Sequence, residues 1–62
     1  MTAVQKLKHR ISLLDLNIAQ AREEIRLTRD YRVEAHLRFK IIDLTFLRKT
    51  LLAQLHTVST DA

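Results

Sequence analysis

The chain has 62 residues, of which 47% are hydrophobic, and it contains no glycine, proline or cysteine. Its 11 Lys and Arg outnumber its 7 Asp and Glu, which gives a formal net charge of +4. Because a domain of this size is marginally stable and the missing cysteines exclude disulfides and thiol-based sites, oligomerisation is the main remaining source of stability.

The first predicted element is a helix over about residues 3–28. Its apolar residues alternate spacings of three and four, as in a helix that packs along another helix: Val4, Leu7, Ile11, Leu14, Ile18, Ala21 and Ile25. The series stops at Thr28, and Thr28-Arg29-Asp30 is the only stretch typical of a turn. We expect Asp30 to cap the next helix by accepting a hydrogen bond from a backbone N–H of its first turn.

The second predicted element is a helix over about residues 31–58 that is apolar on two sides. One stripe consists of Val33, Leu37, Ile41, Leu44, Leu51, Leu55 and Val58. The other consists of Ala35, Phe39, Ile42, Phe46 and Ala53. A helix with a single neighbour needs one apolar stripe only. We therefore expect the first stripe to contact the first helix, and we assign Phe39, Ile42, Phe46 and Ala53 to a dimer or partner interface. Residues 59–62 are predicted to be a frayed tail.

The sequence thus predicts an all-α fold with a single helical-hairpin domain over residues 1–62. Two antiparallel hairpins of this kind are expected to dimerise into a four-helix bundle. The alternative is one continuous helix in a coiled coil, about 80 Å long, which the absence of glycine and proline permits. The change of the dominant apolar stripe from one side to the other favours the hairpin.

No group of residues predicts catalysis or cofactor binding. The hydroxyl residues lack the Gly-rich or strained surroundings of nucleophile and phosphate motifs. His9, His36 and His56 are not spaced to bind a metal ion from one helix. We therefore expect no enzyme activity, no cofactor and no metal site.

Arg48 stands between Leu44 and Leu51 in the first stripe of the second helix. A guanidinium group at an apolar position needs a partner or access to water. A turn near Asp30 brings Asp15 close to this position, so we expect an intrachain ion pair between Asp15 and Arg48. A role of Arg48 at an interface with a partner is the alternative.

Several arginines are candidates for contacts with a partner protein or with phosphate, because the guanidinium fork matches both carboxylate and phosphate: Arg22, Arg26, Arg29, Arg38 and Arg48. In a hairpin, Arg22 approaches Arg38. The alternative is an ordinary solvated face, since acidic residues crowd the same end: Glu23, Glu24, Asp30 and Glu34.

These features favour a small non-enzymatic regulatory, adaptor or inhibitor protein that homodimerises and binds a larger protein. Compact chains of this kind are common among regulators that phages and plasmids encode. The alternatives are an RNA- or DNA-binding helical hairpin and a purely structural coiled-coil element. No apolar run approaches the length of a membrane span and no secretory signal is visible, so we expect a cytoplasmic protein without membrane contact.

Overall fold

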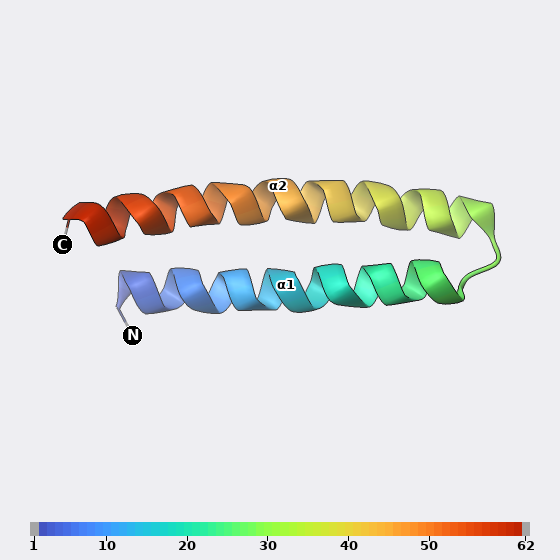
Figure 1. The fold of residues 1–62 in the computed structure, drawn as a ribbon, viewed down its shortest axis with the longest axis horizontal. Coiled ribbons are helices and arrows are strands. Elements are labelled where there is room, and N and C mark those ends of the chain that lie inside the picture. Colours follow the sequence, from blue (N-terminus) through green and yellow to red (C-terminus); the bar gives the residue numbers. More distant parts are fainter. Residues whose placement is uncertain (1, 62) are drawn as a thin grey trace.

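The computed structural model describes the backbone of residues 2–61 and the side chains of residues 2–59. It consists of two antiparallel helices, α1 (Ala3–Leu27) and α2 (Tyr31–Asp61), which lie side by side along their lengths (Figure 1). The molecule measures 48 × 17 × 12 Å, whereas a continuous helix of these residues would be about 90 Å long. The predicted hairpin is therefore confirmed, and the alternative of one continuous helix is wrong.

Helix α1 begins with a capping box. The backbone N–H of Gln5 donates to Thr2 Oγ1 at 3.1 Å, and the backbone N–H of Thr2 donates to Gln5 Oε1 at 2.9 Å. These two bonds satisfy donors that the first helical turn leaves without an intrahelical acceptor. At its other end α1 stops at Thr28, which has an extended backbone and donates its N–H to the carbonyl oxygen of Glu24 at 2.9 Å.

Thr28, Arg29 and Asp30 reverse the chain without glycine. The N–H of Asp30 donates to Thr28 Oγ1 at 3.2 Å, which holds the turn together from within. Asp30 Oδ1 accepts the N–H of Arg32 at 2.9 Å, and its carbonyl oxygen accepts the N–H of Glu34 at 3.0 Å. This is the geometry of an N-cap, so the prediction for Asp30 is confirmed. No described residue has a positive φ, which explains why the turn tolerates the absence of glycine.

The two helices meet along one seam in which positions alternate spacings of three and four. All seven residues of the predicted stripe on α1 are buried or half-buried. On α2 the seam begins at Glu34, because Glu34 is half-buried while Val33 is 44% exposed. The seam residues of α2 are Glu34, Leu37, Ile41, Leu44, Arg48, Leu51, Leu55 and Val58. Arg48 thus occupies a regular position of an antiparallel coiled coil.

The core is a single row of apolar side chains along this seam. Ile11, Leu14 and Leu51 form its central cluster, and Leu7, Leu44 and Leu55 pack against them. Ile18, Ala21 and Leu37 are the other buried residues, and no polar side chain is buried among those described. Two helices cover only one stripe of each other, so the remaining apolar surface of both stays open to solvent.

Helix α2 is longer than predicted. It continues to Asp61 and so extends past the N-terminal end of α1 in Figure 1. Residues 59–61, which were expected to belong to a frayed tail, are helical. Ala62, the last residue of that predicted tail, lies outside the described residues.

Candidate protein-interaction surface

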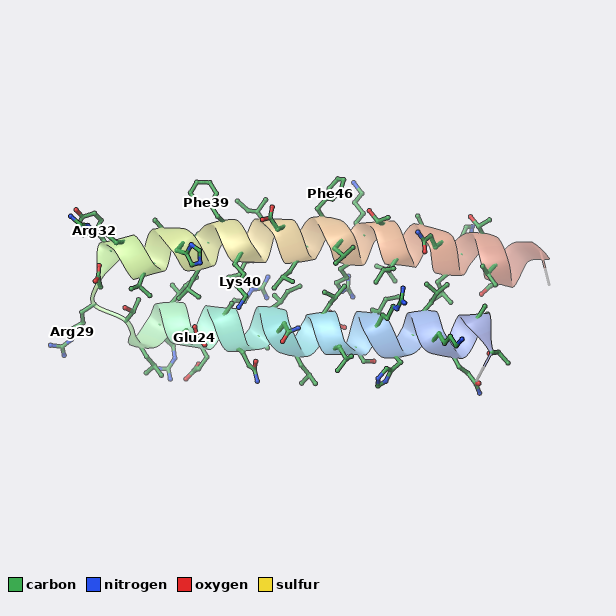
Figure 2. The ribbon with its side chains drawn as sticks, turned by 180° about the vertical axis from the view of Figure 1, so that it is seen from behind. Glu24, Arg29, Arg32, Phe39, Lys40 and Phe46 are labelled. Atoms are coloured by element: carbon green, nitrogen blue, oxygen red, sulfur yellow. The ribbon has the colours of Figure 1, made fainter. Side chains whose placement is uncertain are left out.

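The side of α2 that faces away from α1 carries a row of exposed apolar side chains. Phe39, Ile42 and Phe46 are 69%, 62% and 72% exposed, and Ala53 is also exposed. Figure 2 shows that Phe39 and Phe46 point away from α1. We call Phe39, Ile42, Phe46 and Ala53 the phenylalanine face. It arises because α2 carries two apolar repeats and the seam with α1 uses only the other one.

The phenylalanine face exposes two large aromatic side chains, Phe39 and Phe46, to solvent. Each phenylalanine carries more apolar surface than most other residues, and contiguous exposed patches of this kind mark interaction sites in soluble proteins. Helix α1 has a second group of exposed leucines, which lie outside the seam: Leu13, Leu16 and Leu27. Leu27 lies about three helical turns from Leu16, whereas Phe39, Ile42 and Phe46 follow one another within two turns.

Arg48 and Asp15 connect the two helices. Arg48 Nε donates to Asp15 Oδ1 at 2.6 Å, and their side chains are 39% and 51% exposed. Among the described residues this is the one ion pair between α1 and α2. The structure therefore brings together the two residues that were expected to pair. An ion pair this open to solvent contributes roughly 0–1 kcal/mol, so it directs the alignment of the helices more than it stabilises them.

Two further arginines are paired within their own helices. Arg26 Nη2 lies 2.6 Å from Glu23 Oε1 on α1, and Arg38 Nη2 lies 2.7 Å from Glu34 Oε1 on α2. The hydrogen bonds from Arg26 lower the pKa of Glu23 below its usual range, and the carboxylate raises the pKa of Arg26 in return. Spacings of three and four residues on a helix produce such pairs routinely, so these contacts alone do not indicate a binding site.

One flank of the hairpin carries a groove between the two helices. Its first part is lined by Arg22, Ile25, Arg38, Ile41 and Ile42. Its second part is lined by Asp15, Ile18, Ala19, Arg22, Thr45 and Arg48. Arg22 lines both parts, and we call the two neighbouring depressions together the arginine groove. Arg22 and Arg38 line the first part together, as expected, and Arg22 and Arg48 line the second.

The five arginines proposed from the sequence do not form a single surface. Arg26 and Arg29 do not line the arginine groove. Figure 2 shows Arg29 projecting from the connection between the helices, away from both. Sequence reasoning also missed the isoleucine floor of the groove, formed by Ile25, Ile41 and Ile42. Their positions could have indicated this floor, because residues at or next to the seam are only partly covered by the opposite helix.

Among the described residues, no three of His, Cys, Asp and Glu are grouped to hold a metal ion. Over the same residues, neither helix combines the length and apolar character needed to cross a bilayer.

No protein-family model matches the chain, and no curated protein or solved structure matches it either. The function is therefore inferred from the surface itself.

Proposed function

We propose that the chain is a small non-enzymatic regulatory, adaptor or inhibitor protein that forms a homodimer through the phenylalanine face and binds a larger protein. The observation that supports this proposal is the exposure of Phe39, Ile42 and Phe46 on one side of α2, opposite the seam with α1. Full burial of a phenylalanine or isoleucine contributes about 1.5–3 kcal/mol, so a neighbour that covers this face gains substantial stability.

A second copy of the hairpin is the natural first occupant. A two-fold axis sets the same patch of each subunit against itself, and pairing α2 with α2 gives a four-helix assembly in which the two α2 helices lie between the two α1 helices. The core of the isolated hairpin is a single row of side chains, so the dimer supplies a second apolar layer. This agrees with the general need of chains of this length for stabilisation beyond their own core.

The larger partner binds the surface that the dimer leaves open, namely the arginine groove apart from Ile42 and the exposed leucines of α1. Helical recognition of this kind uses apolar anchors spaced along a helix, with charged residues around them. We place this activity in the cytoplasm, as suits a cysteine-free chain, and regard a phage or plasmid regulator as the closest functional type.

Nucleic-acid binding is a weaker candidate. Arg38 and Arg48 already contact carboxylates, which would repel phosphate. Both phenylalanines lie on the seam-distal side of α2, while the arginine groove lies along a flank between the helices. Base stacking and phosphate contacts would therefore not converge on one strand of nucleic acid.

The proposal is tested by the oligomeric state of Phe46→Asp. We expect the unmodified chain to sediment as a dimer and the variant to sediment as a monomer, because a carboxylate at the centre of an apolar interface is strongly unfavourable. Because Phe46 is outside the seam, a loss of helix in the monomeric variant, measured by circular dichroism, would show that the hairpin depends on the dimer for its stability. Leu16→Asp, a matched change on the exposed side of α1, should leave the dimer intact. A Phe46→Asp variant that remains dimeric would overturn the proposed interface.

A further inference from the structure

The arginine groove combines an apolar floor with a charged rim. Ile25 and Ile41 are half-buried seam residues, and Ile42 continues the apolar surface outward toward the phenylalanine face. Arg22 and Arg38, from opposite helices, line the same part of the groove as these isoleucines. Apolar contact and guanidinium donors are therefore available to one ligand at the same time.

The donors of this rim are largely unused. Among residues with described side chains, Arg22 makes no hydrogen bond or ion pair. Arg38 directs Nε and Nη2 to the same oxygen of Glu34, and Arg48 uses Nε for Asp15. Since each guanidinium carries five N–H donors, all three arginines retain capacity for a further carboxylate.

From this combination we infer that the arginine groove binds an acidic amphipathic helix of a partner protein. An amphipathic helix can lay its apolar side into an apolar groove of this kind. Apolar residues of that helix contact Ile25 and Ile41, and its carboxylates accept hydrogen bonds from Arg22, which has no carboxylate partner among the described side chains. This inference rests on the proposed function, because it names the chemistry of the larger partner.

The rim and the floor favour a protein over nucleic acid. Glu34 and Asp15 place carboxylates next to two of the three arginines, so a continuous row of phosphates would meet alternating charges. A helix with separate acidic side chains can place them only at the unpaired donors. The isoleucine side chains have no hydrogen-bond donor for a phosphate backbone, whereas they can pack against leucine or isoleucine residues of a partner helix.

The test measures binding of a short synthetic helix by fluorescence anisotropy. The labelled peptide presents leucines at alternating spacings of three and four, with glutamates on both sides of the leucine stripe. A second peptide replaces the glutamates with lysines, and a single-stranded oligonucleotide serves as the polyanion. The full chain is compared with Arg22→Gln and with the matched control Arg29→Gln at the turn. Both substitutions are at exposed positions, and circular dichroism verifies that both variants stay helical.

We expect the acidic peptide to bind more tightly than the basic one, and Arg22→Gln to weaken its binding about tenfold, the usual effect of losing a hydrogen bond to a charged group. Arg29→Gln should bind like the unmodified chain. Equal affinity for both peptides, no detectable binding, or an unchanged affinity of Arg22→Gln would overturn the inference. So would an oligonucleotide that binds more tightly than the acidic peptide and depends on Arg22.

The oligomeric state of Phe46→Asp, compared with the peptide assay on the unmodified chain, separates this inference from the proposed dimer. If Phe46→Asp becomes monomeric while the acidic peptide fails to bind the unmodified chain, only the groove assignment is wrong. If Phe46→Asp stays dimeric and Arg22-dependent binding is observed, only the dimer interface is wrong.

Discussion

Arg48 occupies a position that leucine or isoleucine would normally fill. It lies between Leu44 and Leu51 in the seam, and its head group reaches Asp15 on the other helix. A polar residue at a single seam position reduces stability but specifies how two helices align, because only one alignment gives it a partner. Arg48 also lines the arginine groove, so the same residue fixes the register and presents donors to a ligand.

We predict that Arg48→Leu stabilises the protein by about 1 kcal/mol. The leucine buries more apolar surface in the seam, and the lost ion pair is solvent-exposed and contributes roughly 0–1 kcal/mol. Denaturant unfolding at neutral pH measures the change. Asp15→Asn, which keeps the arginine stem in the seam, should cost less than about 1 kcal/mol. A loss of stability in Arg48→Leu would show that the ion pair outweighs apolar packing.

At the scale of the element, both helices begin with a side chain that accepts backbone N–H groups. Thr2 caps α1 together with Gln5, and Asp30 caps α2 through Arg32. The negative charge of Asp30 also complements the positive end of the α2 dipole. Because Asp30 belongs to the connection between the helices, its cap defines both the end of the turn and the start of α2.

Removing the Asp30 side chain tests this role. Asp30→Ala should reduce the free energy of unfolding by about 1 kcal/mol, the usual effect of losing an N-cap acceptor. Asp30→Asn retains an acceptor oxygen, so it should stay within a few tenths of a kcal/mol of the unmodified chain. Thermal unfolding followed by circular dichroism distinguishes the two variants. Equal stability of Asp30→Ala and the unmodified chain would mean that the turn, rather than the cap, starts α2.

The periodicity of the sequence predicted both helices and the turn, but not the start of the second seam. Val33 fits an apolar stripe, whereas the structure places Glu34 in the seam and leaves Val33 exposed. The reason is geometric: counting from Leu37, the unbroken alternation of three and four reaches Glu34. At the end of a hairpin, the stem of a glutamate can pack while its carboxylate reaches Arg38. A prediction from residue type alone therefore assigns the wrong residue to the seam at this end of α2.

At the scale of the whole molecule, the hairpin is a single seam with apolar surface left on both sides. The buried row gives the two helices a defined alignment, but it covers only one of the two apolar repeats of α2. The hairpin is the observed architecture, and the homodimer that we propose is what would cover the second repeat. The hairpin also has a charged surface, the arginine groove, which lies along a flank and shares only Ile42 with the phenylalanine face.

The candidate site was partly predictable. The phenylalanine face follows from spacing, because Phe39, Ile42 and Phe46 share one side of any α-helix. The pairing of Arg48 with Asp15 followed from the position of the turn. The grouping of Arg22, Arg38 and Arg48 over a floor of isoleucines depends on the register between the helices, and a sequence determines that register only through the combined packing of the whole seam.

The most direct test of the central claim, that another chain covers the phenylalanine face, uses Phe46→Trp. The chain has no tryptophan, so the new indole is a unique fluorescent reporter. We predict blue-shifted emission at high protein concentration that shifts to that of a water-exposed indole on dilution, as the dimer dissociates. Leu16→Trp on α1 should not show this shift. Emission from a water-exposed Phe46→Trp at every concentration would contradict the account.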